Sequence, residues 1–432
     1  MSKVELKNIS RIHFIGVGGI GMSALARCFL NEKKVVSGSD RVPSAITDAL
    51  AVEGVQIFTE QVAGNISGDI ELFVYTEAMA QDQEEMVAAR ALGVPMVNYF
   101  EALGLVANPY YLIAVSGTHG KTTTTAMLAD IFEANEKDPT VVVGSLRAKT
   151  QSNFRAGKSK YAIVEACEYK RDFLHLKPDV LVITNVEYEH TDYYKDLADV
   201  QDAFRTFVLQ VNEGGVVVAN KKDPAIAPII AGLDNVIDYT ELFDIKLPLK
   251  QPGIHNRLNA AAALTVARHE KLSLDQSREA LSEFAGTWRR FEYKGEFQGV
   301  PVYDDYAHHP TEIRATLEGV RELYPDKDIT IVFEPHTFSR TGMLFDDFAR
   351  AFAHADRVLL LPIYAAREAN PDGISSRELA VKSLEYNKNV LYVPSYEDAI
   401  ETLKDATKQN DVIVVLGAGN ITKLASELVE NK

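Results

Sequence analysis

The sequence has few cysteines, no excess of basic residues and no long apolar run. Its two cysteines, Cys28 and Cys167, are too few for a disulfide framework and do not form a C-x-x-C pair. The formal net charge of -16 argues against nucleic acid as the main partner, because phosphate backbones are bound by clustered Lys and Arg. No apolar stretch could span a membrane and the first residues are polar, so we expect a cytoplasmic protein without a membrane partner.

What the chain does contain is the composition of an ordinary globular protein, with 46% hydrophobic and 25% charged residues. Its 432 residues are enough for about three domains. Short apolar runs alternate with helical stretches along the chain, which predicts an α/β fold with mostly parallel sheets. We expect domains at residues 1–107, 108–286 and 287–432, since breaks in this pattern follow residues 107 and 286.

A glycine-rich turn after a buried strand is the strongest motif. The apolar run Tyr111 to Val115 leads into G-T-H-G-K-T, and a stretch of helical composition follows. In such a turn the backbone N–H groups close on a phosphate, the lysine reaches the outer phosphates and a threonine hydroxyl can hold Mg²⁺. The general P-loop pattern has glycine in place of Val115, so this form is shortened. The predicted residues of this nucleoside-triphosphate site are Gly117, Thr118, Gly120, Lys121, Thr122 and Thr123.

A second glycine turn lies near the N-terminus. The run Arg11 to Ile15 leads into G-V-G-G-I-G, and Asp40 follows the next predicted strand. This spacing is a dinucleotide fingerprint, in which the turn holds a diphosphate and the acid meets a ribose hydroxyl. The diphosphate of a UDP-sugar fits as well as NAD does, so an NAD-dependent oxidoreductase stays open at this point. The predicted binding residues are Gly18, Gly19, Ile20, Gly21, Ser39 and Asp40.

Possible metal ligands follow two further predicted strands. Glu165 ends one apolar run, and the segment N-V-E-Y-E-H, which ends in His190, follows the next. The carboxyl ends of parallel strands meet at one edge of a sheet, where Lys121 and Thr122 would also lie. Carboxylate and hydroxyl oxygens suit one Mg²⁺, whereas histidine is a less usual ligand for it and is often structural. The predicted metal ligands are Thr122, Glu165 and His190.

Two segments could approach a nucleotide from the second half of the chain. Asn256 precedes an alanine-rich helix predicted from Ala260, where an Asn is first of all a helix cap; together with His255 it could instead face the adenine. Arg289 and Arg290 could be a solvated pair or could bind phosphate with their planar forks.

The densest chemistry of the last third is the run Y-D-D-Y-A-H-H-P, which begins at Tyr303. So many consecutive polar and aromatic residues after a strand are hard to explain by packing alone. The segment E-P-H-T-F-S-R, which ends at Arg340, follows the next predicted strand. A glycine turn from Gly417 to Gly419 is interpreted as architectural.

Taken in order, these motifs resemble those of the Mur ligase family of ATP-dependent amide-forming enzymes, and the resemblance covers nearly the whole chain. It implies a Rossmann-like N-terminal domain for the UDP moiety, a central P-loop ATPase domain and a Rossmann-like C-terminal domain for the amino acid. The alanine-adding branch is the most similar, which implies UDP-N-acetylmuramate and L-alanine as substrates and ATP with Mg²⁺ as cofactors. The muramoyl carboxylate would form an acyl phosphate, which the amine then attacks. We expect a monomer or a homodimer.

The resemblance also implies roles for single residues. The catalytic set it implies is Lys121, His190, His308, His309 and Arg340. Contacts with ATP beyond the glycine turn are implied for His255, Asn256, Arg290 and Asp304. His119 would contact the muramoyl group, and Tyr306 would help to hold the amino acid.

Several positions depart from the family pattern. An acid-rich E-A-D-E-S segment is replaced by one in which Cys167 precedes Glu168, and Glu189 stands where Asp is usual. The chain is short between residues 220 and 252, where the family carries extra antiparallel strands. Thr337 stands where many members have Arg, so Arg340 would bind the amino acid with less help.

Three alternatives stay open in the sequence. A recycling ligase of the same family, which adds a preformed tripeptide, would share nearly every residue named above. An NAD-dependent oxidoreductase would leave the phosphate loop unexplained, and a nucleotide-switched binding protein would leave the Asp304 segment unexplained. Residues 200–205 lack the lysine that later-acting Mur ligases carbamylate, which agrees with the alanine-adding branch.

Overall fold

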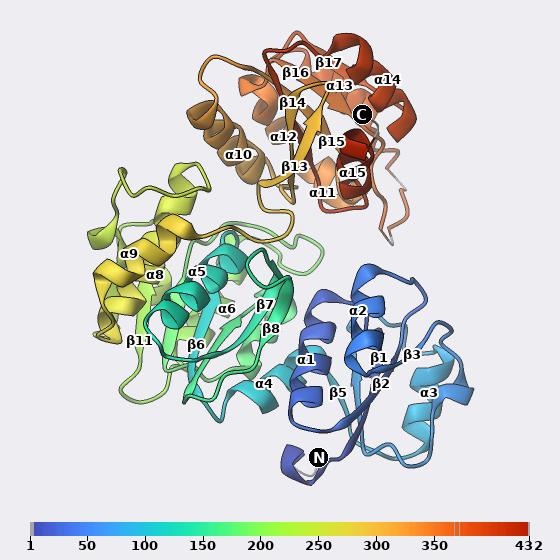
Figure 1. Ribbon diagram of the computed structural model, residues 1–432, viewed down its shortest axis with the longest axis vertical. Helices are drawn as coiled ribbons and strands as arrows, with labels where there is room; N and C mark the ends of the chain where they lie inside the picture. Colours follow the sequence, from blue (N-terminus) through green and yellow to red (C-terminus); the bar gives the residue numbers. More distant parts are fainter. Residues whose placement is uncertain (1–3, 367, 371, 431–432) are drawn as a thin grey trace. The chain divides into compact units, whose positions relative to one another are not determined.

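The computed structural model describes residues 4–366, 368–370 and 372–430. Three sheets follow one another along the chain, coloured blue, green and orange to red in Figure 1. All three are mostly parallel and alternate with helices, so the prediction of a three-domain α/β fold is confirmed. The chain divides into two compact units, one up to Phe243 together with Asn259–Leu281, the other made of Asp244–Leu258 and the residues from Ser282 on. The predicted domain boundaries stay predictions.

The first sheet has five parallel strands. Their order across the sheet is β3 (Gln56–Phe58), β2 (Val35–Ser39), β1 (Arg11–Ile15), β4 (Leu72–Tyr75) and β5 (Met96–Asn98). Its helices are α1 (Ile20–Asn31), α2 (Ala45–Glu53), α3 (Glu84–Ala91) and α4 (Tyr99–Ala107). Strand order reverses beside β1, and parallel sheets bind ligands at such switch points. The first glycine turn follows β1 and therefore lies there.

The second sheet has β6 at its centre. Its order is β12 (Val236–Asp238), β11 (Val216–Ala219), β10 (Val180–Ile183), β6 (Tyr111–Ser116), β9 (Tyr161–Glu165), β7 (Thr140–Arg147) and β8 (Ser152–Arg155). β8 pairs antiparallel with β7, while the other pairs are parallel. Its helices are α5 (Lys121–Ala134), α6 (Leu197–Val208), α7 (Ala227–Ile230), α8 (Ile254–His269) and α9 (Leu274–Glu283).

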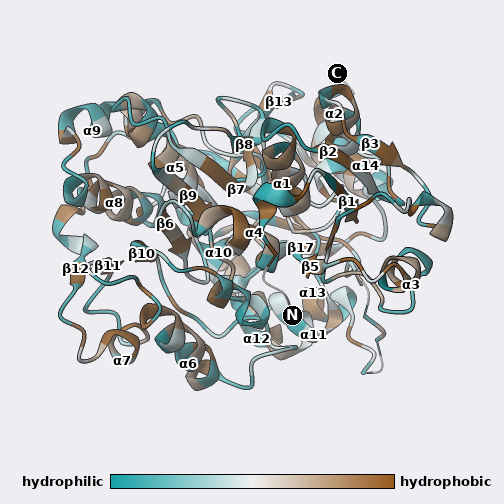
Figure 2. Cartoon of the chain, turned by 90° about the horizontal axis from the view of Figure 1, so that it is seen from below, coloured by the Kyte–Doolittle hydropathy of each residue, from teal (hydrophilic) through white to brown (hydrophobic). Residues whose placement is uncertain are grey.

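The central strands of this sheet are apolar because both faces are covered, and Figure 2 shows hydrophobic colour on β6 and β9 against hydrophilic connecting loops. Since β9 and β10 are the neighbours of β6, the segments that follow all three strands meet at the carboxyl end of the sheet. The short stretch between residues 220 and 252 contributes α7 and the parallel strand β12.

The start of α8 corrects one prediction. The helix begins at Ile254 and not at Ala260, because Gly253, with φ +96°, ends the preceding chain and lets the helix begin directly after it. Asn256 therefore lies inside the first turn, where its Nδ2 donates to Pro252 O at 2.8 Å, and it does not cap the helix at residue 260. Beyond the other end of α8, Glu270 accepts the hydroxyls of Tyr111 (2.8 Å) and Tyr161 (2.9 Å), which tie it to the starts of β6 and β9.

The third sheet has six strands, of which the first is antiparallel to the second. Its order is β13 (Glu292–Phe297), β14 (Val300–Asp305), β18 (Asp411–Leu416), β15 (Asp328–Phe333), β16 (Arg357–Leu360) and β17 (Val390–Tyr392). Its helices are α10 (Pro310–Leu323), α11 (Phe338–Met343), α12 (Phe345–Ala351), α13 (Ser376–Ser383), α14 (Tyr396–Ala406) and α15 (Thr422–Glu430). Successive residues of β15, such as Val332 and Phe333, belong to separate apolar cores on the two faces. Among the described residues, no helix is long and apolar enough to cross a membrane.

Candidate active site

The second glycine turn closes onto the N-terminus of α5. Gly117 and Gly120 have φ of +130° and +81°, a region that side chains rarely adopt. A Cβ on Gly120 would also overlap Asn259 Oδ1. The N–H groups of the first turn of α5, which includes Thr122 and Thr123, give this end of the helix a positive potential. The local geometry is that of an anion-binding turn.

Lys121 forms a buried ion pair at the start of α5. Its Nζ donates to the carbonyl oxygens of Gly117 (2.5 Å) and Thr118 (2.9 Å) and lies 2.9 Å from Glu168 Oε2. Burial lowers the pKa of Lys121, but its neighbours, Glu168 first among them, together outweigh this and raise the pKa above its ordinary value. Burial likewise raises the pKa of Glu168, and Lys121 together with His190 brings it below its ordinary value. Both groups are therefore charged at neutral pH.

Two of the three predicted metal ligands, Thr122 and Glu165, contact each other, and the third, His190, does not join them. Thr122 Oγ1 donates to Glu165 Oε1 at 3.0 Å, and Glu165 Oε2 accepts from Gly144 N at 2.8 Å. His190 contacts Glu168 instead, with Nε2 3.3 Å from Oε1. The sequence prediction did not include Glu168 among the ligands, although Glu168 stands in the segment that corresponds to the acid-rich segment of the family.

The donor atoms at this edge of the sheet suit a hard cation. The hydroxyl of Thr122 and the carboxylate of Glu165 supply the oxygen ligands that Mg²⁺ prefers. A second group of potential ligand atoms, one each from Cys167, Glu168 and His190, lies within 4.8 Å of one another. Burial, followed by the Glu168 charge, raises the pKa of the Cys167 thiol to about 12, so this sulfur stays protonated. The oxygen pair of Thr122 and Glu165 is therefore the better site for Mg²⁺.

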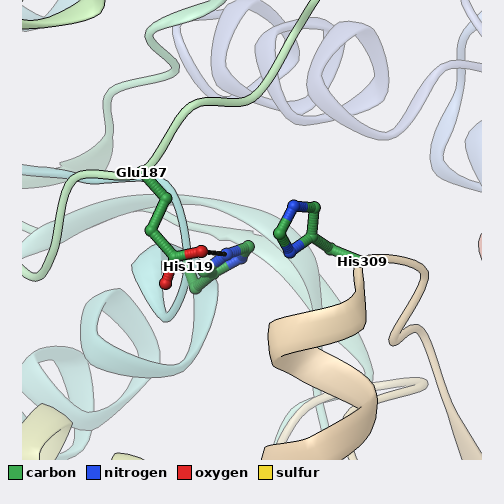
Figure 3. Close-up of side chains that lie close together, drawn as sticks. All are labelled: His119, Glu187 and His309. Atoms are coloured by element: carbon green, nitrogen blue, oxygen red, sulfur yellow. Dashed lines mark ion pairs between the residues drawn. The ribbon is translucent and has the colours of Figure 1, made fainter. Parts of the chain in front are cut away.

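The loop after β10 fixes the histidine of the glycine turn. Asn185 Oδ1 accepts from His119 N and Asn185 Nδ2 donates to His119 O, both at 2.9 Å, while Thr184 Oγ1 donates to the same carbonyl at 2.6 Å. The ring Nε2 of His119 lies 3.7 Å from Glu187 Oε2, as Figure 3 shows. Sequence reasoning did not assign Thr184 and Asn185; their only signal was the I-T-N wording directly after a strand.

The carboxylate of Asp40 binds the backbone of the first glycine turn. Asp40 Oδ2 accepts from Gly18 N at 2.9 Å, and a Cβ on Gly18 would lie 2.7 Å from this oxygen. A Cβ on Gly21 would lie 2.5 Å from the Tyr99 ring, so Gly21 is required by packing. Gly19 is the N-cap of α1, and Ile20 begins the helix. The turn presents the helix N-terminus at the switch point of the sheet.

Ser39 does not share this exposed position. Its side chain is fully buried, and its Oγ donates to Glu85 Oε2 at 2.5 Å. Glu85 is also fully buried and accepts from Asn65 Nδ2 at 2.7 Å. The predicted contact of Ser39 with substrate stays a prediction, and its observed role is to anchor the end of β2.

The two arginines at the start of the C-terminal part behave differently. Of the two interpretations left open for this pair, a solvated position does not hold for Arg289, which is 4% exposed and donates to the carbonyl oxygens of Gly417 and Gly419, the latter at 3.0 Å. The pair with these carbonyls compensates the burial of its charge. Arg290 lies over the Tyr306 ring, 5.0 Å from its centroid. The glycine turn after β18 is thus part of the fold, as interpreted from the sequence.

The two aspartates at the end of β14 are buried. Asp304 accepts from Thr422 Oγ1 at 2.6 Å and lies 3.4 Å from Arg289 Nε. Asp305 accepts from the N–H groups of Phe291 (2.8 Å) and Ala307 (2.7 Å), and burial raises its pKa to about 6. Because Asp304 has no exposed surface, its predicted contact with ATP stays a prediction that requires its pair with Thr422 to open.

Several predicted side chains of the C-terminal part gather around His336. The ring of His308 lies 6.1 Å from that of His336, and His308 Nδ1 is 2.9 Å from Tyr306 O. Arg340 Nη1 is 3.2 Å from His336 Nδ1. His309 instead precedes α10 as its N-cap (Figure 3), and its ring accepts from Thr311 N. His336 stood in the E-P-H segment but was not assigned a role from the sequence.

Family models match the chain in three consecutive stretches. They are described as the Mur ligase family catalytic domain at residues 11–111, the Mur ligase middle domain at 115–241, and the Mur ligase glutamate ligase domain at 289–419. A UDP-N-acetylmuramate–L-alanine ligase from Agathobacter rectalis is 39% identical to the chain and is aligned over 100% of both proteins. The chain belongs to the Mur ligase family.

Solved structures agree with the fold of this Mur ligase. The crystal structure of a UDP-N-acetylmuramate-alanine ligase from Thermotoga maritima matches it with a TM-score of 0.82 and 28% identity, over 98% of each chain. A murein peptide ligase from Psychrobacter arcticus has a TM-score of 0.72 and 23% identity, also over 98% of each chain, and this likeness shows the fold alone. Both glycine turns of this Mur ligase lie inside matched stretches, which favours a ligase over an NAD-dependent oxidoreductase.

Proposed function

We propose that this Mur ligase joins L-alanine to the carboxylate of UDP-N-acetylmuramate at the expense of ATP. The observation that carries the proposal is the set of charged side chains at the N-terminus of α5, in a chain whose full-length relative bears that activity in its name. Lys121 would neutralise phosphate charge during transfer, and Glu168 would keep its contact with His190 when Lys121 turns to the nucleotide. Mg²⁺ held by Thr122 and Glu165 would supply electrostatic stabilisation of the transferred phosphoryl group.

The reaction has two steps in this proposal. A carboxylate oxygen of the muramoyl group attacks the γ-phosphorus of ATP, and ADP leaves with the bridging oxygen. The nitrogen of L-alanine then attacks the carbonyl carbon of the acyl phosphate. Phosphate leaves, the nitrogen loses a proton, and an amide remains. Water must be kept from the acyl phosphate, since hydrolysis would waste it.

The remaining residues are assigned to the substrates. The N–H groups at Gly19 and Ile20 would hold the UDP diphosphate at the N-terminus of α1, and His119 would contact the muramoyl group. In the C-terminal part, Arg340 is suited to the alanine carboxylate because its planar fork binds two oxygens at once. His308 lies near His336, the histidine that Arg340 contacts, and Tyr306 lies beside His308, so both would complete that site.

Further nucleotide contacts are proposed for His255, Asn256 and Arg290, with domains at residues 1–107, 108–286 and 287–432. We also propose a second Mg²⁺ beside Glu168 and His190, a cytoplasmic location, and a monomer or homodimer. The side-chain oxygens of Glu168 and the ring of His190 support the second metal position by their 3.3 Å separation.

The test is phosphate release from ATP and Mg²⁺ in the presence of UDP-N-acetylmuramate. Three acceptor conditions are compared: no amino acid, L-alanine, and the L-Ala-D-Glu-diamino-acid tripeptide. Strong stimulation by L-alanine alone, with formation of the amide product, is the expected result. Stimulation by the tripeptide alone would reassign the chain to the recycling branch. A Lys121→Ala preparation made in parallel identifies any phosphate release by a contaminating ATPase.

A further inference from the structure

Asn153, on the antiparallel strand β8, is fully buried against α1. Its side-chain amide donates to Ile20 O and to Ser23 Oγ, the latter at 2.9 Å. Its Oδ1 accepts from Arg27 Nη1 at 2.6 Å. Both ends of the amide therefore bind α1, and loss of either would leave a buried polar group unpaired.

The three partners of Asn153 lie on one face of α1. Ile20, Ser23 and Arg27 are spaced by three and four residues, the spacing of one side of a helix. The third partner is itself fixed, because the Nε and Nη2 of Arg27 donate to the carboxylate of Glu53 at 2.8 and 3.0 Å. Asn153 thus binds the first two turns of α1 as one rigid element, starting at Ile20, the first residue of the helix.

The other strand of the same hairpin reaches the phosphate loop. Gly144 on β7 donates its N–H to Glu165 Oε2 at 2.8 Å, and a Cβ on Gly144 would lie 2.6 Å from that oxygen. Glu165 in turn accepts from Thr122. The hairpin formed by β7 and β8 therefore contacts two sites. Its strand β7 binds Glu165, which accepts from Thr122 after the phosphate loop, and its strand β8 binds the start of α1.

We propose that Asn153 is a positioning residue, which fixes the N-terminal turn of α1 on the β7–β8 hairpin and so sets the place of the UDP diphosphate relative to the phosphate loop. The inference rests on the proposed function, since it takes α1 as the helix that receives the diphosphate. Helix N–H groups bind an anion only when they point at it, so a small rotation of the first turn weakens binding. The phosphate loop keeps its own support from Thr184 and Asn185 and does not depend on Asn153.

The test compares Asn153→Ala and Asn153→Asp in the full chain. The aspartate has the size of asparagine and keeps a partner for Arg27, but it cannot donate to Ile20 O or Ser23 Oγ. Calorimetry measures the Kd of UDP-N-acetylmuramate and, separately, of ADP with Mg²⁺. We expect the UDP substrate to bind about tenfold more weakly to both variants, the effect of one or two lost hydrogen bonds. ADP should bind as it does to the wild type, and steady-state kinetics should show a raised KM for the UDP substrate with nearly unchanged kcat.

Asn387→Ala is the matched control. Asn387 is also a buried asparagine whose amide donates to two carbonyl oxygens, those of Phe352 and Ala355, but it lies in the second unit. It should lower thermal stability and leave the Kd of the UDP substrate unchanged. Wild-type affinity in Asn153→Asp, or equal weakening of both ligands, would overturn the inference. A wild-type protein that binds ADP but not UDP-N-acetylmuramate would instead refute the proposed function.

Discussion

Two glycine turns in this Mur ligase both join a buried strand to the start of a helix, and they differ in the side chains around them. The first, after β1, has Asp40 bound to its own backbone at Gly18. The second, after β6, has Lys121 inside the turn with Glu165 and Glu168 beside it. In both, backbone N–H groups at a helix start offer an anion site.

The difference in side chains corresponds to two tasks: the first turn would only bind a phosphate, and the second would also take part in its transfer. A diphosphate that serves only for recognition needs fixed dipoles, whereas a reacting γ-phosphate needs a cation and metal ligands that respond as charge develops. The two turns can therefore be damaged independently, and each change should affect one ligand.

The largest effect is expected for Lys121→Ala. Turnover should fall by roughly a hundredfold to a thousandfold or more, because the buried cation at the phosphates is lost. The Kd of UDP-N-acetylmuramate should not change, since Lys121 does not contact the first turn. Phosphate-release assays and calorimetry give the two values. The control is Lys160→Ala, which removes a lysine over the Tyr111 and Tyr161 rings. Near-normal turnover in Lys121→Ala would contradict the assignment.

A second expected effect is a change in the pH dependence of stability at Asp172→Asn. Asp172 lies in a 3-10 segment four residues after Glu168, and burial, then the Glu77 charge, raises its pKa to about 7. Within the described part of the chain its Oδ2 has no hydrogen-bond partner. The carboxyl of Asp172 thus holds its proton more tightly in the folded state than in the unfolded state, where the pKa of an aspartate is about 3.9. The free energy of unfolding therefore falls as the pH rises from the unfolded pKa to the folded pKa.

Chemical unfolding of both proteins at about pH 5 and about pH 8 measures the effect, which we expect to be about 1–2 kcal/mol after allowance for solvent screening. The wild type should lose more stability over this interval than Asp172→Asn, which cannot titrate there. Parallel pH profiles of the two proteins would show that the buried carboxyl of Asp172 carries no cost.

The sharpest test of independence is the pair Gly18→Ala and Gly120→Ala. Gly120→Ala forces a side chain into the left-handed region at a cost of about 1–2 kcal/mol and into Asn259, so ADP binding should weaken about tenfold or more. Gly18→Ala pushes on Asp40 and should weaken only the UDP substrate. Gly64→Ala is the control, since its Cβ would meet open space. Loss of both ligands in either variant would contradict two separate sites.

The smallest effect is expected for Asp40→Asn. The new side chain keeps an oxygen for the N–H of Gly18, so the turn retains its shape. We expect the Kd of the UDP substrate to change less than about fivefold, which corresponds to less than about 1 kcal/mol. A loss larger than that, seen by calorimetry, would show that the carboxylate binds the substrate directly.

The buried strands could be predicted from the sequence because parallel strands covered on both faces are plain apolar runs. The expected runs Arg11 to Ile15 and Tyr111 to Val115 agree with β1 (Arg11–Ile15) and β6 (Tyr111–Ser116). The antiparallel strands β8 (Ser152–Arg155) and β13 (Glu292–Phe297) were not predicted, because they are short, polar and at sheet edges. The start of α8 was predicted too late because its first turn is mostly polar, and Asn256 was interpreted as a residue that precedes the helix.

The site followed from the sequence only where the sheet brings its residues together. Thr122 and Glu165 follow neighbouring strands, so their contact could be inferred from the order of a parallel sheet. The partners of the buried charged groups could not be inferred in this way. Arg289 reaches Gly417 across 128 residues and Thr422 reaches Asp304 across 118, and nothing in the local pattern of either segment specifies the other.

The first unit contains the later segment Asn259–Leu281, so it cannot be completed during synthesis until this segment has been made. Glu270 binds Tyr111 and Tyr161, partners separated from it by 159 and 109 residues, so these contacts close very long loops. A nascent chain released only as far as Phe243 would leave the starts of β6 and β9 without this partner. The central sheet therefore completes its packing only after the ribosome has passed residue 281, when the chain of the second unit has already begun to emerge.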